Sequence, residues 1–168
     1  MVADFQSAYP RETFWQSKRL SLDGSLDFSC EASAKKIIGQ DIINSNAGSF
    51  LVSDRAKRLI DSFVLPNTLQ FLPLVLRCSD ERLIELYLIN TLHQEKIINI
   101  EESEKLKIGP SDNDFILLDR GLKILPSALK EKKIGRNYPS PYNTEIFLHN
   151  DLVKIIKENN MNRCIIFD

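Results

Sequence analysis

The chain has 168 residues, 43% of them hydrophobic and 27% charged, and its formal net charge at pH 7 is −1. This length is enough for one domain with a sizeable core, and the composition excludes an intrinsically disordered chain. The near-zero net charge gives no general attraction to nucleic acid or to an anionic membrane surface. We expect a single domain over residues 1–168, with residues 1–13 as a loose polar lead-in.

The first third of the chain predicts little regular structure. Residues 14–20 and 26–32 flank the turn sequence LDGS and are typical of a pair of strands. Residues 35–48 mix apolar residues with glycines and several asparagines, which favours an irregular segment with at most a short strand or one turn of helix. Residues 49–52 predict a short strand.

The first long helix is expected from Ser53 to about Val64. Its apolar residues recur at i, i+3, i+4, i+7 and i+8, which is one buried face of a helix: Ala56, Leu59, Ile60, Phe63 and Val64. Charged residues cover the opposite face. Pro66 ends the helix, because proline cannot continue the backbone hydrogen bonding.

The strongest pair of predicted strands covers residues 69–77 and 82–90, and the residues CSDE between them are typical of a turn. Pro73 lies inside the first run and removes one backbone donor. We therefore expect that strand to lie at a sheet edge or to carry a bulge. The near-continuous hydrophobicity of both runs predicts a sheet that is covered on both faces in its middle.

The predicted elements beyond residue 90 are shorter. Strand candidates cover residues 97–100, 115–119 and 122–125; residues 126–133 predict a short helix, and residues 135–143 a loop. The chain then predicts a strand, a helix and a last strand: 145–149, Asn150 to about Asn159, and 164–167. Because strands and helices do not alternate regularly, we assign the α+β class, with a mixed, mostly antiparallel sheet packed by two or three short helices.

Two hinges share a pattern, FLVSDRAKRLI at 50–60 and FLHNDLVKII at 147–156, in which a polar residue separates an apolar run from a helix. Such a junction can bind phosphate, but phosphate loops also need glycines that let the backbone approach the ligand, and neither hinge has one. Ser53 and Asn150 are therefore interpreted as N-caps. A carboxylate follows each cap and complements the helix dipole: Asp54 and Asp151.

The cysteines and the amino-terminal residues predict a cytoplasmic protein. The three cysteines are far apart and odd in number, which favours free thiols over a disulfide or zinc framework: Cys30, Cys78 and Cys164. The first 15 residues lack the charged start and apolar block of a signal peptide, and no apolar run is long enough to span a bilayer.

Residues for catalysis or metal binding are sparse. His93 and His149 are the two candidate bases of a small hydrolase-like enzyme, but no G-x-S-x-G nucleophile motif accompanies them. The sequence contains no C-x-x-C, no H-E-x-x-H and no complete calcium loop. We expect no catalytic residue, no metal and no cofactor.

The segment 128–136 is basic and has tyrosines close by, which is a weak signal for nucleic acid and a better one for a protein contact. Tyrosine and arginine are favoured at interface centres, and nearby prolines reduce the entropy lost on binding. The predicted partner-contact residues are therefore Arg136, Tyr138 and Tyr142, followed by two carboxylates of the polar loop SDNDF: Asp112 and Asp114.

Several motifs carry a family resemblance: LVSDRAKRLI (51–60), LQFLPL (69–74), YLIN (87–90), IEESE (100–104) and the closing EIFLHNDLVKII…CIIFD. In this order they resemble the small α+β immunity proteins of bacterial polymorphic-toxin systems of the type VI or Rhs type, formerly a domain of unknown function. The resemblance covers residues 50–168. The shared motifs describe the scaffold, so no contact residue is transferred from the family to this chain.

The resemblance implies a cytoplasmic protein that binds and neutralises a cognate toxin domain as a non-enzymatic, stoichiometric inhibitor. Its expected partner is therefore a protein, with no nucleic acid and no membrane. Two alternatives stay open from the residues alone. One is the small hydrolase-like enzyme that uses His93 or His149. The other is a scaffold or regulatory domain that binds some other protein.

Overall fold

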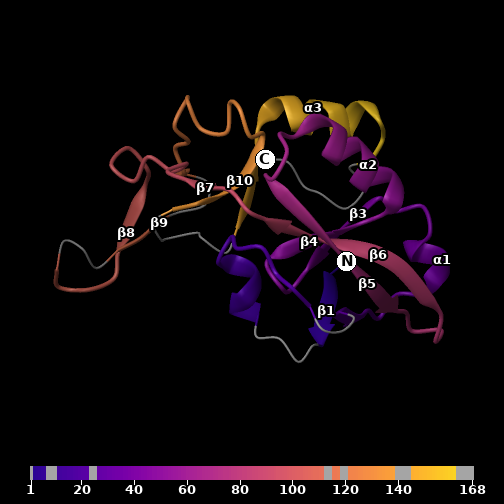
Figure 1. Ribbon diagram of the computed structural model, residues 1–168. Coiled ribbons are helices and arrows are strands. Elements are labelled where there is room, and N and C mark those ends of the chain that lie inside the picture. The colour runs from indigo at the N-terminus through magenta and orange to yellow at the C-terminus, as the bar shows by residue number, and fades with distance from the viewer. Residues whose placement is uncertain are drawn as a thin grey trace.

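The computed structural model describes residues 2–6, 11–22, 26–111, 115–117, 121–138 and 145–161. Six strands form one closed sheet in the order β1-β2-β5-β6-β4-β3 (Figure 1). Their bounds are β1 Val2–Gln6, β2 Leu26–Ser29, β3 Ile42–Ser45, β4 Ser49–Val52, β5 Leu69–Arg77 and β6 Leu83–Thr91.

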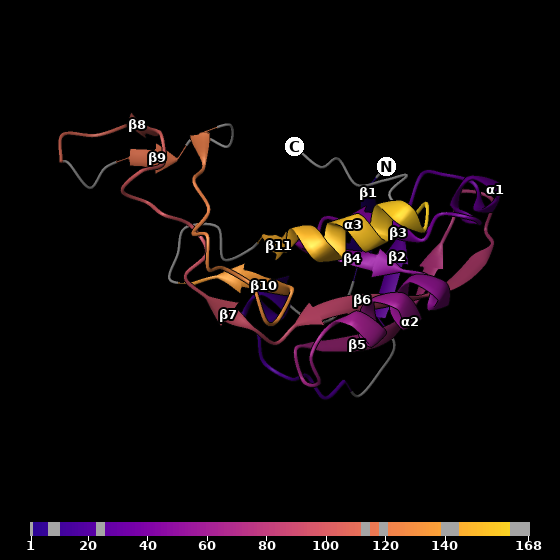
Figure 2. The ribbon, with the colours of Figure 1, turned by 90° about the horizontal axis from the view of Figure 1, so that it is seen from above.

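Two smaller sheets follow in the second half of the chain. Three strands pair in the order β11-β10-β7: β7 Gln94–Glu95, β10 Ile134–Asn137 and β11 Ile146–Leu148. Two further strands form a separate hairpin-like pair: β8 Lys105–Lys107 and β9 Phe115–Leu117. Figure 2 shows this pair standing apart from the closed sheet, at the far end of the molecule from α1.

Four helical segments complete the described fold: a 3-10 helix Arg11–Trp15, α1 Ala34–Ile37, α2 Asp54–Phe63 and α3 Asn150–Glu158. Among the described strands, six pairs are antiparallel and three are parallel: β1–β3, β2–β5 and β7–β10. The predicted α+β class with a mixed, mostly antiparallel sheet is confirmed. None of the helices in the described part of the chain has the length and hydropathy of a membrane span.

Both faces of the closed sheet are covered. Successive strand residues point to opposite faces, so β4 gives Leu51 to the inner core and Val52 to the outer one. The inner core is filled by residues of the closed sheet together with Phe14 and α1. The outer core lies between the sheet, α2, α3 and the three-stranded sheet. This double coverage explains the near-continuous apolar runs and confirms the expectation drawn from them.

The predicted amino-terminal segments need correction. The lead-in over 1–13 contains β1, which pairs with β2 and β3, and the strand expected over 14–20 is replaced by the end of the 3-10 helix and irregular backbone. β1 forms because distant strands supply its hydrogen-bonding partners, and a five-residue window does not show that. Residues 35–48 contain most of α1 and all of β3. The prediction for this segment was at most a short strand or one turn of helix, and the structure has one of each.

Pro73 lies in a regular strand. β5 pairs with β2 on one side and β6 on the other, and the β5–β6 register runs from Leu69 to Arg77 without a bulge. The prediction of an edge or a bulge is therefore wrong for the strand as a whole. The β2–β5 ladder begins at Leu74, so the missing N–H of Pro73 breaks no bond of that ladder.

Two predictions for the second half are also wrong. Residues 126–133 form turns instead of a helix, because Leu129 and Lys133 adopt positive φ values of 57° and 65° that an α-helix does not contain. A single bridge between Ile98 and Ile124 replaces the strands expected at 97–100 and 122–125. The terminal strand predicted over 164–167 lies outside the described residues.

Candidate functional site

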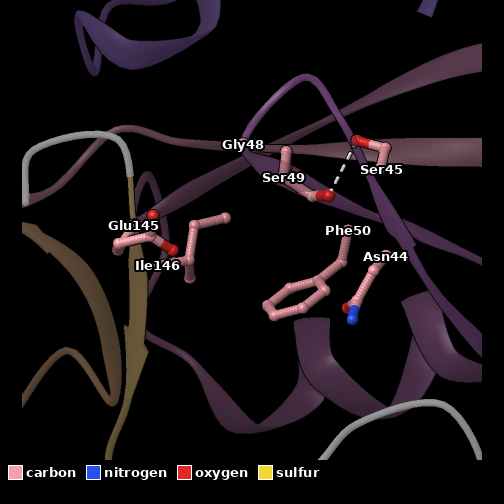
Figure 3. Close-up of a pocket in the computed structure, with 7 residues that line it drawn as sticks. All are labelled: Asn44, Ser45, Gly48, Ser49, Phe50, Glu145 and Ile146. Carbon is pink, nitrogen blue, oxygen red and sulfur yellow. Dashed lines mark hydrogen bonds between the residues drawn. The ribbon is translucent and has the colours of Figure 1, made fainter. Parts of the chain in front are cut away.

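A cleft of about 370 Å³ lies between the β3–β4 hairpin and the start of β11 (Figure 3). This volume falls within the range of ligand pockets in proteins. Seven of the described residues line it: Asn44, Ser45, Gly48, Ser49, Phe50, Glu145 and Ile146. The two walls come from segments that are about a hundred residues apart in the sequence, and the cleft exists only because the three-stranded sheet packs beside the closed sheet.

The hairpin wall is held in place by hydrogen bonds at its tip. Gly48 adopts a positive φ of 67°, which glycine accepts without strain and which completes the turn. The Ser45 hydroxyl donates to the Ser49 carbonyl at 2.8 Å, and the Trp15 indole donates to the Ala47 carbonyl at 3.0 Å. The Ser49 hydroxyl bonds to a carbonyl of β6. The tip is therefore a firm support for any ligand.

Arg136 connects the two walls, because it pairs in register with Ile146 of β11 and bonds to Gly48 of the hairpin. This β10 residue is 0% exposed, and its Nη2 donates to the Gly48 carbonyl at 2.9 Å. Burial lowers the pKa of the Arg136 guanidinium to about 10, and the nearby Glu145 carboxylate opposes that decrease. Arg136 is still protonated at neutral pH, so a buried cation lies behind the cleft with a carboxylate at its mouth.

One buried polar atom of the cleft has no hydrogen-bond partner among the described residues. The side-chain oxygen of Asn44 is buried and accepts no hydrogen bond from the described residues. Figure 3 shows the Asn44 carboxamide beside the ring of Phe50, its register partner on β4. Buried polar groups in folded proteins are nearly always hydrogen-bonded, and an exception in a cleft points to a missing partner.

The two histidines predicted as candidate bases each lie near a carboxylate. His93 Nε2 lies 3.0 Å from Glu95 Oε2, and the other oxygen of Glu95 accepts from the Leu129 backbone N–H. A carboxylate of this kind orients an imidazole, which also occurs around catalytic bases. Neither His93 nor His149 lines the cleft. The hydrolase-like alternative stays a prediction.

His149 has a structural task at the start of α3. Its Nδ1 accepts from the Asp151 backbone N–H at 3.2 Å, so His149 is the N-cap and Asn150 is the first helical residue. The predicted cap at Asn150 is wrong by one position. The predicted cap at Ser53 is confirmed, since its hydroxyl accepts from the Ala56 N–H at 3.1 Å.

The predicted partner-contact residues do not form one surface in the described structure. Tyr138 is 60% exposed just after β10, whereas Arg136 has no exposed surface. The loop expected over 135–143 is wrong at its start, because β10 is stabilised by its neighbours β7 and β11. The other three lie outside the described residues: Asp112, Asp114 and Tyr142. A role of these five in partner binding stays a prediction.

The described residues contain no group of three or more His, Cys, Asp or Glu side chains that could hold a metal ion. Cys30 and Cys78 are buried free thiols on neighbouring strand ends. Burial, followed by the proximity of Cys30, raises the pKa of the Cys78 thiol to about 11. Cys164 lies outside the described residues.

A second candidate surface is the β8–β9 arm, which we define as strands β8 and β9 together with Ile108. Its base is fixed by hydrogen bonds, because the Ser103 hydroxyl accepts from the Lys123 N–H at 2.9 Å and Glu104 N–H donates to the Gly121 carbonyl at 3.0 Å. Beyond this base, the Leu106 and Ile108 side chains are 50% and 63% exposed.

Sequence reasoning missed the cleft residues Asn44, Phe50 and Glu145. Phe50 and Glu145 each begin a motif noted in the sequence, but those motifs were interpreted as helix starts and scaffold, and no local pattern brings Glu145 to the β3–β4 hairpin. Gly135 of β10, by contrast, could have been recognised from the sequence as a position of close packing. A Cβ at this position would lie 2.8 Å from a methyl group of Leu129, and a glycine within a strand often marks such a close approach.

Comparisons with protein-family models and with curated proteins found no match to this chain. The resemblance to immunity proteins therefore rests on the quoted motifs, and the function must be argued from the surfaces that the fold presents.

Proposed function

We propose that this chain is a non-enzymatic inhibitor of the immunity type, which binds one protein toxin domain stoichiometrically and neutralises it in the cytoplasm. Two observations support the proposal. The first is the order of scaffold motifs from residue 50 onward. The second, which carries the structural argument, is the projecting β8–β9 arm with its exposed apolar side chains (Figure 2).

The arm has the properties of a contact element. Because side chains alternate along a strand, Leu106 lies on one face of β8 and Lys105 and Lys107 on the other, and the exposed Ile108 follows directly after the strand. A two-stranded pair is marginally stable by itself in water, and a partner that covers its apolar face stabilises it. Covering the exposed part of Leu106 and Ile108 would contribute on the order of 1 kcal/mol each.

A protein partner suits this arm better than nucleic acid or a membrane. The apolar residues are few, and the neighbouring exposed side chains carry both signs, with Glu101, Glu102 and Glu104 close to the lysines of β8. An apolar centre surrounded by mixed charges is the usual composition of a protein–protein interface. A polypeptide can also pair with an open strand edge, which adds main-chain hydrogen bonds.

The proposal expects a toxin domain to be encoded next to the gene of this chain, and co-expression with that domain is the test. Wild-type protein should restore growth and form a 1:1 complex, measured by size-exclusion chromatography with light scattering. A double variant, Leu106→Asp with Ile108→Asp, should bind about tenfold more weakly or worse, since both side chains would be buried on binding.

Leu83→Asp is the matched control, because Leu83 is 59% exposed on β6, outside the arm. It should protect cells as well as the wild type. Failure of the wild type to protect would refute the inhibitor proposal. Equal protection by the arm double variant would refute the arm as the contact element. A 1:1 complex without protection would favour the scaffold alternative.

Tyr138→Ala tests the contact residue that the sequence predicted and the structure leaves exposed. Arg136→Ala is unsuitable for this purpose, because it removes a buried cation that holds the β3–β4 tip and would confound binding with folding. The single change at Tyr138 should weaken toxin binding while the circular dichroism spectrum stays unchanged. Unaltered affinity would remove Tyr138 from the interface.

A further inference from the structure

We infer that the cleft between the β3–β4 hairpin and β11 binds a lysine or arginine side chain presented by the protein partner. This inference rests on the proposed function for the source of that side chain. The cleft itself is a separate feature of the chain. Its walls belong to the closed sheet and to the start of β11, and the β8–β9 arm contributes none of its described lining residues.

The walls of the cleft suit an alkyl chain. Phe50 and Ile146 are half-buried and contribute the apolar surface on its two sides. Figure 3 shows the Phe50 ring and the Ile146 side chain extending into the space between the hairpin and β11. Lysine and arginine carry long apolar stems that lie along such surfaces while their charged ends reach a polar group.

The polar groups of the cleft call for a hydrogen-bond donor. The buried oxygen of Asn44 accepts no hydrogen bond from the described residues, and the Ser45 hydroxyl already donates its proton to Ser49. The unsatisfied atom is therefore an acceptor, next to the NH₂ group of the same carboxamide. An ammonium or guanidinium has only donors, so its hydrogen bonds would satisfy the Asn44 oxygen, whereas a carboxylate has no donor and would leave that oxygen unsatisfied.

The charge at the mouth of the cleft has the matching sign. Glu145 is exposed there, and a carboxylate accepts several hydrogen bonds at once, so a second cation can share it. Arg136 lies behind Gly48 and does not line the cleft, yet its charge offsets part of the field of Glu145. We therefore expect a free cation to bind only in the millimolar range and a tethered one to contribute specificity.

The experiment is a nuclear magnetic resonance titration of the isotope-labelled full chain with Nα-acetyl-L-lysinamide. The matched probe is Nα-acetyl-L-norleucinamide, which has the same stem without the ammonium group. The lysine probe should shift the Asn44 side-chain amide and the backbone amides of Ser49 and Ile146 in a saturable way. The norleucine probe should bind about tenfold more weakly. Equal binding of the two probes, or no shift at these residues, would overturn the inference.

Two variants locate the binding energy. Glu145→Gln removes the charge at the mouth of the cleft. Asn44→Ala removes the unsatisfied acceptor oxygen and leaves Glu145, the carboxylate near Arg136, unchanged. Each should weaken the lysine probe at least about threefold, and Glu85→Gln, an exposed carboxylate elsewhere on β6, should not. Asn44→Ala decides the question if Glu145→Gln disturbs the fold. Wild-type affinity in a folded Asn44→Ala variant would refute the donor argument.

This titration separates the two proposals, because it uses no toxin. Binding of the lysine probe without protection of cells would leave the cleft established and the inhibitor proposal refuted. Protection of cells without binding of the probe would support the inhibitor proposal and refute the cleft as a cation site.

Discussion

Helices α2 and α3 pack over the same outer core, yet different chemistry fixes their amino ends. Ser53 caps α2 with a hydroxyl, which also donates to Asp41 Oδ1 at 2.6 Å. His149 caps α3 with a ring nitrogen, next to Asp151, whose carboxylate accepts from Lys133 Nζ at 2.7 Å. One start is therefore held by a neutral hydroxyl, and the other by an imidazole that lies beside an ion-paired carboxylate.

The difference shows how the two helices depend on the rest of the molecule. Arg55, in the first turn of α2, contacts Asp41 at 2.9 Å and donates to the Asn159 carbonyl at the end of α3 at 2.8 Å. The start of α3 is instead tied to Lys133, just before β10. The two hinge sequences are similar, but the start of α2 depends on contacts near the β3–β4 hairpin, and the start of α3 depends on the three-stranded sheet.

The largest effects should come from the shared core, where the two helices are equivalent. Ile60 of α2 and Ile156 of α3 are 3% and 1% exposed. Replacing either by alanine should lower the free energy of unfolding by about 2–5 kcal/mol, because it deletes buried methyl groups and leaves a cavity. Urea denaturation measures this. Ile38→Ala, at a 66% exposed side chain, should cost less than about 1 kcal/mol. A small loss at Ile156 alone would show that α3 is not part of the core.

A smaller effect should distinguish the two helix starts. Ser53→Ala should cost about 1 kcal/mol of stability and leave partner binding intact, because it removes a cap that faces the protein's own backbone. Asn150→Ala should change stability by less than about 0.5 kcal/mol, since Asn150 is an exposed first helical residue and not the cap. An equal loss of unfolding free energy in the two variants, measured by chemical denaturation, would show that Asn150 is the cap of α3.

The smallest effect should appear as a pH dependence at the start of α3. The hydrogen bond from Lys133 lowers the pKa of the Asp151 carboxyl, burial opposes it, and the charges of Lys133, His149 and Lys154 add to it. A pKa that is lower in the folded state gives stability that is present above the unfolded value of about 3.9 and is lost as pH falls through the folded value.

Thermal unfolding of Asp151→Asn between about pH 5 and pH 2 should therefore show a shallower loss of stability than the wild type. Lys133→Met should reproduce this change, because it removes the main cause of the lowered pKa. An unchanged acid slope in both variants would show that the contact does not persist in solution.

Local signals explain which parts of the fold could be predicted. The face of α2, its cap at Ser53 and the β5–β6 pair depend on residues close together in the sequence, and their patterns were sufficient. The cap of α3 was predicted one residue too late, because asparagine is a common N-cap and histidine an unusual one. β1 and β10 depend on strands far away in the chain, which a short window does not contain.

The candidate site was less accessible to sequence reasoning. Asn44 and Glu145 have ordinary neighbours in the sequence, and only the packing of β11 against the hairpin makes them face one cleft. Arg136 was singled out for an interface because arginine is frequent there, but strand pairing on both sides of β10 takes its side chain inside. Residue type alone does not distinguish a buried cation from an exposed one.

The bond from Arg136 to Gly48 also has a consequence for cooperativity. Opening either the three-stranded sheet or the β3–β4 tip by itself would separate a buried cation from the carbonyl that accepts its hydrogen bond, which is costly in a low-dielectric interior. The two regions should therefore open together. Amide hydrogen exchange at β10 and at the hairpin tip should follow one common free energy, which makes the segments on both sides of the cleft a single folding unit.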